Sequence, residues 1–370
     1  MSTSLSALAG LPPAAIRLRP TGLLHGAAAA AALAAGEALP LAGGPAAFAW
    51  VEALAIDRGH MASAAAPLAA LRRWAARRGG KTAAHIEAQL AAIAAPRPAW
   101  AGIALDRPRI MAIVNLTPDS FSDGGDLADP AAAIAAGRAM LAAGADIVDI
   151  GGESTRPGAA PVSPEEERRR VEPVIRALAQ AGAAVSVDTR HAAVMAAALA
   201  AGARIVNDVT ALTGDPAAPA TAARSGAALV LMHMQGEPRT MQREPTYVSA
   251  PLEVADYLAG RIAACAAAGI PRERILVDPG IGFGKTLAHN LDILDRLALL
   301  HGLGCGVLLG VSRKSSIGRL TGVAEPKERL PGSLAGALYG LAQGVQVVRV
   351  HDVAQTRQAL AVWQAIAGRP

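Results

Sequence analysis

The stretch Arg109-Ile-Met-Ala-Ile-Val-Asn115 sets the pattern that decides the fold of most of this 370-residue chain. It is a short apolar run that ends in a polar residue, and an Ala-rich stretch follows it from Pro130. Similar runs and stretches alternate as far as Val350, which is typical of repeated βα units. The alternation predicts eight strands, at Ile110–Val114, Ile147–Ile150, Ala184–Val187, Ile205–Val206, Leu229–Met232, Ile275–Val277, Val307–Leu309 and Val345–Val350.

Near-continuous apolar strands separated by helices imply a parallel sheet that helices cover on its outer face. Eight such units in about 260 residues match the size of a TIM (β/α)8 barrel. The predicted fold class is therefore α/β, with residues 106–370 forming the barrel. Residues 1–105 are expected to form a small N-terminal α/β or helical extension, and its three Trp residues, Trp50, Trp74 and Trp100, predict a small core within it.

Each predicted strand runs into polar residues at its C-terminal end. A single polar residue there is typical of a helix cap or a turn. Eight in succession have another meaning, because the C-terminal ends of barrel strands meet at the mouth where barrel enzymes hold their active sites. An active site is therefore predicted among Asn115, Asp149–Glu153, Asp188, Asn207, Asp208, His233, Asp278, Ser312, Arg313, Lys314, Arg349, His351 and Asp352.

Composition limits the function classes. The net charge of +5 arises within residues 1–105, which hold nine Lys and Arg against four Asp and Glu. Residues 106–370 are therefore neutral, which argues against nucleic-acid binding, and the basic cluster from Arg72 to Lys81 has the spacing of a solvated helix face. No segment of about 20 strongly apolar residues predicts a membrane span. Cys265 and Cys305 form no disulfide or metal-binding pattern, so a cytoplasmic location is predicted.

Scarce residue types point to the same segments. The chain has 31 Arg but only four Lys, three Asn and three Phe. Such a bias indicates drift toward Ala, Arg and Gly wherever a side chain matters little. The remaining Asn, Lys and Phe residues are therefore candidates for function, and the predicted strand ends hold Asn115, Phe121, Asn207, Phe283, Lys285 and Lys314.

The segments at the strand ends resemble those of the dihydropteroate synthases, from about Arg109 to Asp352. Two long matches are similar to the first and second loops of that family: Asn115-Leu-Thr-Pro-Asp-Ser-Phe-Ser-Asp-Gly-Gly125 and Gly151-Gly-Glu-Ser-Thr-Arg-Pro-Gly158. Shorter ones follow in the family's order: Ser186-Val-Asp-Thr189, Asn207-Asp208, His233-Met-Gln-Gly236, Asp278-Pro-Gly-Ile-Gly-Phe-Gly-Lys285, Ser312-Arg-Lys-Ser315 and Arg349-Val-His-Asp352.

This resemblance implies a transferase of folate biosynthesis. Such an enzyme joins 6-hydroxymethyl-7,8-dihydropterin pyrophosphate to p-aminobenzoate and releases 7,8-dihydropteroate and pyrophosphate. The resemblance also implies Mg²⁺ as the cofactor and sulfonamides as inhibitors. The expected partners are the two small-molecule substrates and a second copy of the chain in a homodimer, with no nucleic acid and no membrane.

The resemblance implies roles for individual residues as well. The pterin-binding residues would be Asp188, Asn207, Asp278, Gly310 and Lys314. Pyrophosphate would be held by Asn115, Arg349 and His351, with the Asn115 amide also a ligand of Mg²⁺. The p-aminobenzoate site would consist of Phe121, Thr155, Arg156, Pro157, Phe283 and Ser315. The catalytic set would be Asp188, Asp278, Lys314, Arg349 and His351.

Two other functions compete with this interpretation. The pterin domain of a corrinoid-linked methyltetrahydrofolate methyltransferase is also a barrel, but it needs neither Arg349 and His351 nor a loop like Ser154-Thr-Arg-Pro157. An inactive folate-binding scaffold should have lost catalytic positions, and none is lost. Residues 1–105 could dock on the barrel, form a dimer or bind a partner. His233 is interpreted as a structural histidine.

Overall fold

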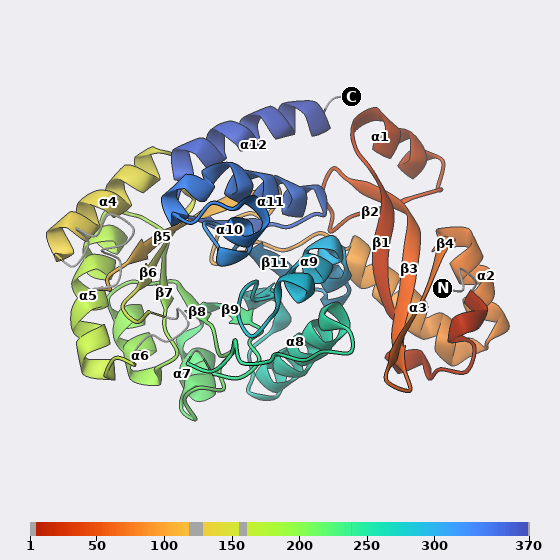
Figure 1. Cartoon of the computed structure of the whole chain (residues 1–370), viewed down its shortest axis with the longest axis horizontal. Coiled ribbons are helices and arrows are strands. Elements are labelled where there is room, and N and C mark those ends of the chain that lie inside the picture. Colours follow the sequence, from red (N-terminus) through yellow and green to blue (C-terminus); the bar gives the residue numbers. More distant parts are fainter. Residues whose placement is uncertain (1–4, 118–128, 155–160, 238, 369–370) are drawn as a thin grey trace.

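The computed structural model describes residues 5–117, 129–154, 161–237 and 239–368. Figure 1 shows a barrel with helices around it and, at its side, a sheet built from the N-terminal residues. The barrel is closed, in the order β10-β11-β12-β5-β6-β7-β8-β9. Its parallel strands are β5 (Arg109–Asn115), β6 (Ile147–Gly151), β7 (Val185–Asp188), β8 (Ile205–Asp208), β9 (Ala228–Met232), β10 (Ile275–Asp278), β11 (Gly306–Leu309) and β12 (Val347–Val350).

Helices cover the outside of the barrel, as Figure 1 shows. They are α4 (Pro130–Ala142), α5 (Pro164–Gln180), α6 (Ala192–Ala200), α7 (Ala218–Ser225), α8 (Ala250–Ala267), α9 (Leu287–Asp295), α10 (Ser315–Thr321), α11 (Leu330–Ala342) and α12 (Val353–Ala367), with the short 3-10 helices η4 (Arg272–Arg274), η5 (Leu297–Leu303) and η6 (Pro326–Arg329). The predicted TIM barrel is therefore confirmed. Among the described residues, no helix is both long and apolar enough to cross a membrane.

The predicted strands differ from the observed ones by at most two residues at either end. The difference at the eighth strand has a clear cause. Val345 was expected to begin that strand, but its N–H donates to Gly340 O and so completes the end of α11. Gln346 joins the sheet in part through its side chain, because its Oε1 accepts from Val307 N at 2.7 Å.

The inside of the barrel is built in layers. Its lower layer is apolar and joins residues from seven strands with Trp100, which lies below them. Side chains two residues further along each strand point to the same face. That step replaces Ile147 by Asp149, Ile205 by Asn207 and Val347 by Arg349. The same period that fills the core with apolar side chains therefore carries polar ones to the mouth.

Residues before the barrel form an antiparallel sheet, in which β3 pairs with β1, β2 and β4. The extension was expected to be either α/β or helical, and this sheet shows that it is α/β. Its elements are η1 (Leu5–Leu8), η2 (Pro13–Ala15), β1 (Arg17–Leu24), α1 (Gly26–Ala34), β2 (Leu39–Pro40), β3 (Ala47–Asp57), β4 (His60–Pro67), α2 (Leu68–Arg77) and α3 (Gly80–Ala94). Within the predicted basic cluster, Arg72 is exposed and pairs with Glu87. Arg78 instead donates to the carbonyl groups of Leu8 and Leu11.

The extension has its own core, but the three Trp residues do not share it. Trp74 of α2 packs in that core with residues of the sheet and α3. Trp100 packs instead into the lower layer of the barrel, and its Nε1 donates to Arg274 O at 3.0 Å. Trp50 is 46% exposed. The prediction of a small core is confirmed, and of the three Trp residues Trp74 packs in it.

The extension docks on the side of the barrel through β1 and β3. Arg19 lies between the two parts, because it donates to Glu52 Oε2 at 2.9 Å and to Asp295 Oδ1 at 3.1 Å. Arg17 binds Asp256 of α8 at 2.7 Å. Leu54 of β3 belongs to the apolar core of the barrel. Of the three roles considered for these residues, docking on the barrel is therefore established by direct contacts.

Candidate active site

Six of the eight barrel strands contribute residues to one cavity at the mouth of the barrel. Asp188 ends β7, Asn207 lies near the end of β8 and Asp278 ends β10, while Arg349 lies in β12. Strand alternation aims these side chains inward, and the turns after the strands add the rest. The cavity is lined by Ile113, Asp188, Asn207, Val209, Met232, Asp278, Phe283, Gly310, Ser312, Lys314, Arg349 and His351.

Arg349 lies between two carboxylates beneath this cavity. Its Nε donates to Asp149 Oδ2 at 2.6 Å, and its Nη2 donates to Asp188 Oδ2 at 2.8 Å. Asp149 is fully buried, and its Oδ2 also accepts from Asn207 Nδ2 at 3.0 Å. This last bond fixes the amide of Asn207 with its nitrogen toward Asp149. Asp149 therefore holds two predicted ligand-binding side chains in place at once.

Burial controls the protonation of the two carboxylates that face the cavity. It raises the pKa of Asp188 to about 7, although the positive charge of Arg349 acts in the opposite direction. It also raises the pKa of Asp278, against the bond that Gly280 N donates to Asp278 Oδ1 at 2.7 Å. A ligand that brings N–H donors would stabilise both carboxylates in their charged form.

Lys314 reaches the cavity from the start of α10. Its Nζ donates to Ile281 O and lies 4.4 Å from the centroid of the Phe283 ring. Burial lowers the pKa of Lys314 to about 8, although Asp278 opposes this shift. The ammonium group is therefore held between the turn after β10 and the acids of the site.

The turns that follow β11 and β12 are tied together. Ser312 Oγ lies 3.0 Å from His351 Nδ1, and it accepts from His351 N at 3.2 Å. Arg313 forms a two-bond ion pair with Asp352, at 3.0 and 2.6 Å. Arg313 adopts a left-handed backbone with φ of 58°, which non-glycine residues rarely adopt. These contacts fix His351 beside Arg349 at the rim.

The interpretation of His233 as a structural residue agrees with its contacts. It is buried, and burial lowers the pKa of His233 to about 3, so the ring is neutral near pH 7. Its Nδ1 lies 2.9 Å from Lys285 Nζ. Lys285 also donates to Gly280 O and Phe283 O, each at 2.9 Å. Lys285 thereby holds the glycine-rich turn that carries Phe283 into the cavity.

The structure brings together most of the predicted site. Asp188, Asn207, Asp278, Gly310, Lys314, Phe283, Arg349 and His351 all line the cavity. Asn115 ends β5 beside Gly151, where a Cβ atom would lie 3.3 Å from Asn115 Oδ1. Ser315 is exposed at the first residue of α10. The predicted residues Phe121, Thr155, Arg156 and Pro157 lie outside the described residues.

Sequence reasoning placed Asp149 among the strand-end residues but gave it no specific role, and it treated Arg349 and Asp188 as separate groups. The structure shows that these three residues form one ion-paired cluster. A signal for Asp149 was present, since a carboxylate in the middle of an apolar inner strand requires a partner. That partner is Arg349, which lies 200 residues away in the sequence and comes close only because the barrel is closed.

Comparisons with known proteins agree with this geometry. A model of the pterin binding enzyme family matches residues 111–351. The dihydropteroate synthase of Neisseria meningitidis serogroup B is 52% identical over 269 residues, which cover 71% of this chain and 94% of that protein.

Solved structures give the same result. The Xanthomonas albilineans dihydropteroate synthase with 4-aminobenzoic acid superposes with a TM-score of 0.69 and 50% identity, over 73% of this chain and 97% of that one. The Yersinia pestis dihydropteroate synthase in complex with a sulfonamide drug superposes with a TM-score of 0.69 and 45% identity, over 71% of this chain and 95% of that one.

The barrel, the acidic and cationic mouth, and the family match define a pterin-binding enzyme. Within that class, the chain belongs to the dihydropteroate synthase family. The comparisons support this assignment over the corrinoid-linked methyltransferase and over the inactive scaffold.

The raised pKa of Asp188 leads to a testable pH dependence. Only the ionised carboxylate accepts two N–H donors, so the affinity for a pterin analogue without pyrophosphate should rise about tenfold between pH 6 and pH 8. The Asp188→Asn variant should bind the analogue about tenfold or more weakly and lose this pH dependence. Calorimetry over that range tests the prediction. A variant whose affinity still rises with the wild-type profile would assign the titration to another group.

Proposed function

We propose that this chain condenses 6-hydroxymethyl-7,8-dihydropterin pyrophosphate with p-aminobenzoate. The products would be 7,8-dihydropteroate and pyrophosphate. The observation that carries the proposal is the convergence of Asp188, Asn207, Asp278 and Lys314 on one cavity, with Arg349 beside them. These groups provide the acceptors and donors that the edge of a pterin ring requires.

The reaction displaces pyrophosphate from a methylene carbon. A C–N bond forms between the amine of p-aminobenzoate and that carbon, the C–O bond to pyrophosphate breaks, and the amine loses a proton to solvent. An aryl amine is neutral near pH 7, so no activated Ser or Cys nucleophile is needed. The main task of the site is to stabilise a cationic pterin methylene and a highly charged leaving group.

The two buried carboxylates suit the pterin. Its guanidine-like edge offers N–H donors to Asp188 and Asp278, and charge-assisted bonds of this kind are about twice as strong as neutral ones. Negative charge beside the ring would also stabilise the positive charge that develops on the methylene carbon. Asn207 offers its amide oxygen, because its nitrogen is bound to Asp149. Lys314 supplies a donor for the pterin carbonyl or a ring nitrogen.

Arg349 and His351 are the proposed pyrophosphate ligands. Arg349 uses Nε and Nη2 for its two carboxylates, and Nη1 takes part in neither bond. A guanidinium can bind phosphate oxygens through several N–H groups, so it suits a leaving group with many of them. The ion pair with Asp188 implies that phosphate binding and pterin binding affect each other.

The p-aminobenzoate site is proposed on the outer side of the pterin. Phe283 lines the cavity at the turn after β10. Ser315 directly follows Lys314 in the sequence and is exposed. Phe121, Thr155, Arg156 and Pro157 would complete this site. Sulfonamides copy the shape and charge of p-aminobenzoate, and we propose that they bind here.

Mg²⁺ is the proposed cofactor, and Asn115 is its proposed protein ligand. The amide oxygen faces Gly151, which leaves space beside it because it has no side chain. Mg²⁺ keeps several waters and needs few protein oxygens, so one amide at the rim fits it. When bound, the ion would neutralise charge on the pyrophosphate group.

Two wider properties are also proposed. We expect the chain to act in the cytoplasm, where the free, buried Cys265 and Cys305 stay reduced. We also expect a homodimer. The adjacent helices α11 and α12 expose Tyr339, Val362 and Ile366, which are candidates for the contact between two copies.

The proposed function predicts a specific pattern of inhibition. Pyrophosphate release should require p-aminobenzoate for sustained turnover, because the amine completes the displacement. A sulfonamide should compete with p-aminobenzoate and not with the pterin substrate, since the two pockets are distinct. Steady-state kinetics with each substrate varied in turn tests this pattern. Competition against the pterin substrate would contradict the two-pocket arrangement.

The proposed metal role predicts sensitivity to chelation. EDTA should lower the rate of dihydropteroate formation, and added Mg²⁺ should restore it. The Asn115→Ala variant should need more Mg²⁺ for half of its maximal rate, because it lacks the proposed protein ligand. The Gln180→Ala variant, at the exposed C-terminal end of α5, controls for loss of an amide. If EDTA leaves product formation unchanged, the metal role of Asn115 is wrong.

A further inference from the structure

A second group of ionisable side chains lies beside the barrel mouth, outside the cavity described above. Glu153 follows β6, Glu167 lies in the first turn of α5, and His191 precedes α6. One ligand atom from each of the three lies within 4.8 Å of the others. From this geometry we propose that Glu153, Glu167 and His191 form a binding site for a divalent transition-metal ion, with Zn²⁺ as the best fit.

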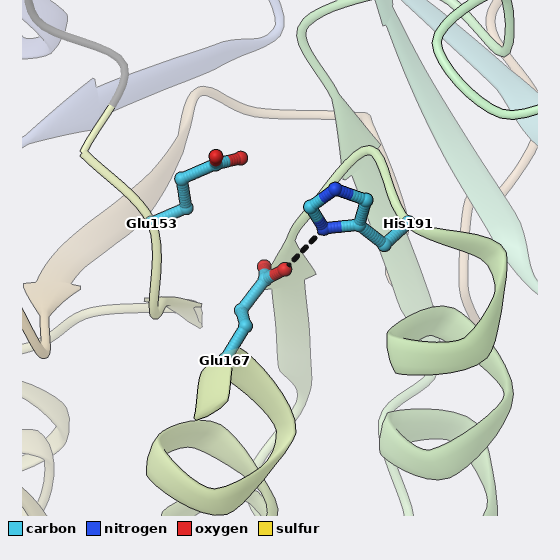
Figure 2. A group of neighbouring side chains, drawn as sticks. All are labelled: Glu153, Glu167 and His191. Atoms are coloured by element: carbon cyan, nitrogen blue, oxygen red, sulfur yellow. Dashed lines mark hydrogen bonds and ion pairs between the residues drawn. The ribbon is translucent and has the colours of Figure 1, made fainter. Parts of the chain in front are cut away.

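The surroundings of Glu167 give the strongest reason to expect that a cation binds here. Its side chain is 0% exposed, and its Oε2 lies 2.7 Å from His191 Nδ1. In the described structure, its Oε1 is buried and meets no donor at hydrogen-bond distance, although the Thr189 hydroxyl lies near the carboxylate. A buried carboxylate oxygen without a partner is costly, because nothing replaces its lost hydration. Figure 2 shows the carboxylate end of Glu167 directed at the space between Glu153 and His191.

The type of ligand atoms selects the ion. Zn²⁺ accepts both imidazole nitrogen and carboxylate oxygen, and catalytic Zn²⁺ sites use three protein ligands with a water in the fourth position. Mg²⁺ favours oxygen ligands, so the imidazole of His191 disfavours it. A metal ion would replace the proton between His191 Nδ1 and Glu167 Oε2 and release it to solvent. The ligand atoms would close in around the ion, since two atoms that each bind it at about 2.0–2.2 Å are at most about 4.4 Å apart.

Arg190 is the competitor for this site. It donates to both oxygens of Glu153, each at 2.9 Å, and so neutralises that carboxylate without a metal ion. Its side chain is 30% exposed and can move into solvent when a metal ion takes Glu153. Glu167 receives no such ion pair from an arginine in the described structure. The cluster therefore holds two carboxylates but only one permanent cation.

The backbone around the cluster is built for close packing. A Cβ on Gly152 would lie 2.9 Å from Glu167 Cγ and 3.1 Å from Glu167 O, so glycine is needed for α5 to approach. Glu153 Oε1 also accepts from Val162 N at 3.2 Å, just before α5. The proposed ion would join the end of β6 to the starts of α5 and α6. Its ligands therefore come from positions that the fold already holds.

Calorimetric titration of the metal-free full-length protein with ZnCl₂ tests the proposal. We expect one equivalent to bind. The His191→Ala and Glu167→Gln variants should each bind Zn²⁺ at least about tenfold more weakly, because each loses a ligand. The Arg190→Met variant should bind more tightly than wild type, because it removes the competing cation. His60→Ala, which loses an exposed histidine far from the cluster, is the matched control and should behave as wild type.

Co²⁺ gives an independent readout. Its visible absorption bands should appear in the wild type and disappear in His191→Ala. The Asn115→Ala variant should keep both Zn²⁺ binding and these bands, so failure of the proposed Mg²⁺ role would not be confused with failure of this site. Absence of Zn²⁺ binding by the wild type would overturn the proposal. So would binding that persists in both His191→Ala and Glu167→Gln, or binding that Arg190→Met weakens, since the cluster would then be only an ion-pair network.

Discussion

The guanidinium of Arg349, between the carboxylates of Asp149 and Asp188, is the interaction on which the active site depends. Without the cation, two acids beneath a cavity would repel each other. The cation allows the carboxylates of the adjacent strands β6 and β7 to lie side by side. Removal of one partner from a buried ion pair typically costs about 3–5 kcal/mol, because the remaining charge is left uncompensated. The polar layer of the barrel is therefore a single unit rather than a set of independent side chains.

The other binding groups depend on that unit or on a second one beside it. Asp149 orients Asn207, and Asp188 presents its carboxylate to the cavity. On the opposite wall, Lys285 fixes the carbonyls of the turn that carries Phe283, and Phe283 in turn packs against the ammonium of Lys314. A pterin between these walls would meet acceptors on one side and a donor on the other. Preorganised charge of this kind is usually the largest contribution to a reaction that builds a cation.

Much of this could be predicted from sequence, and the failures have physical causes. Strand positions and the inward side chains followed from apolar runs and the two-residue period of a strand, so Asp188, Asn207 and Asp278 were found. The role of Asp149 was missed because its partner, Arg349, lies on β12, and no local pattern relates residues 200 positions apart. The packing of Trp100 under the barrel could not be predicted for the same reason, since the strands that it contacts come after it in the sequence. The docking of the extension depends on ion pairs such as that of Arg17 with Asp256, which spacing does not reveal.

The most direct measurement is a double-mutant cycle between Asp149 and Arg349, with the affinity for a pterin analogue without pyrophosphate as the readout. The variants are Asp149→Asn, Arg349→Gln and the pair together. If the two residues act as one unit, each single change should weaken binding, and the double variant should lose less than the sum of the two. The expected coupling is about 1–3 kcal/mol. Losses that add to within about 0.5 kcal/mol would contradict the account, because Asp149 and Arg349 would then act independently.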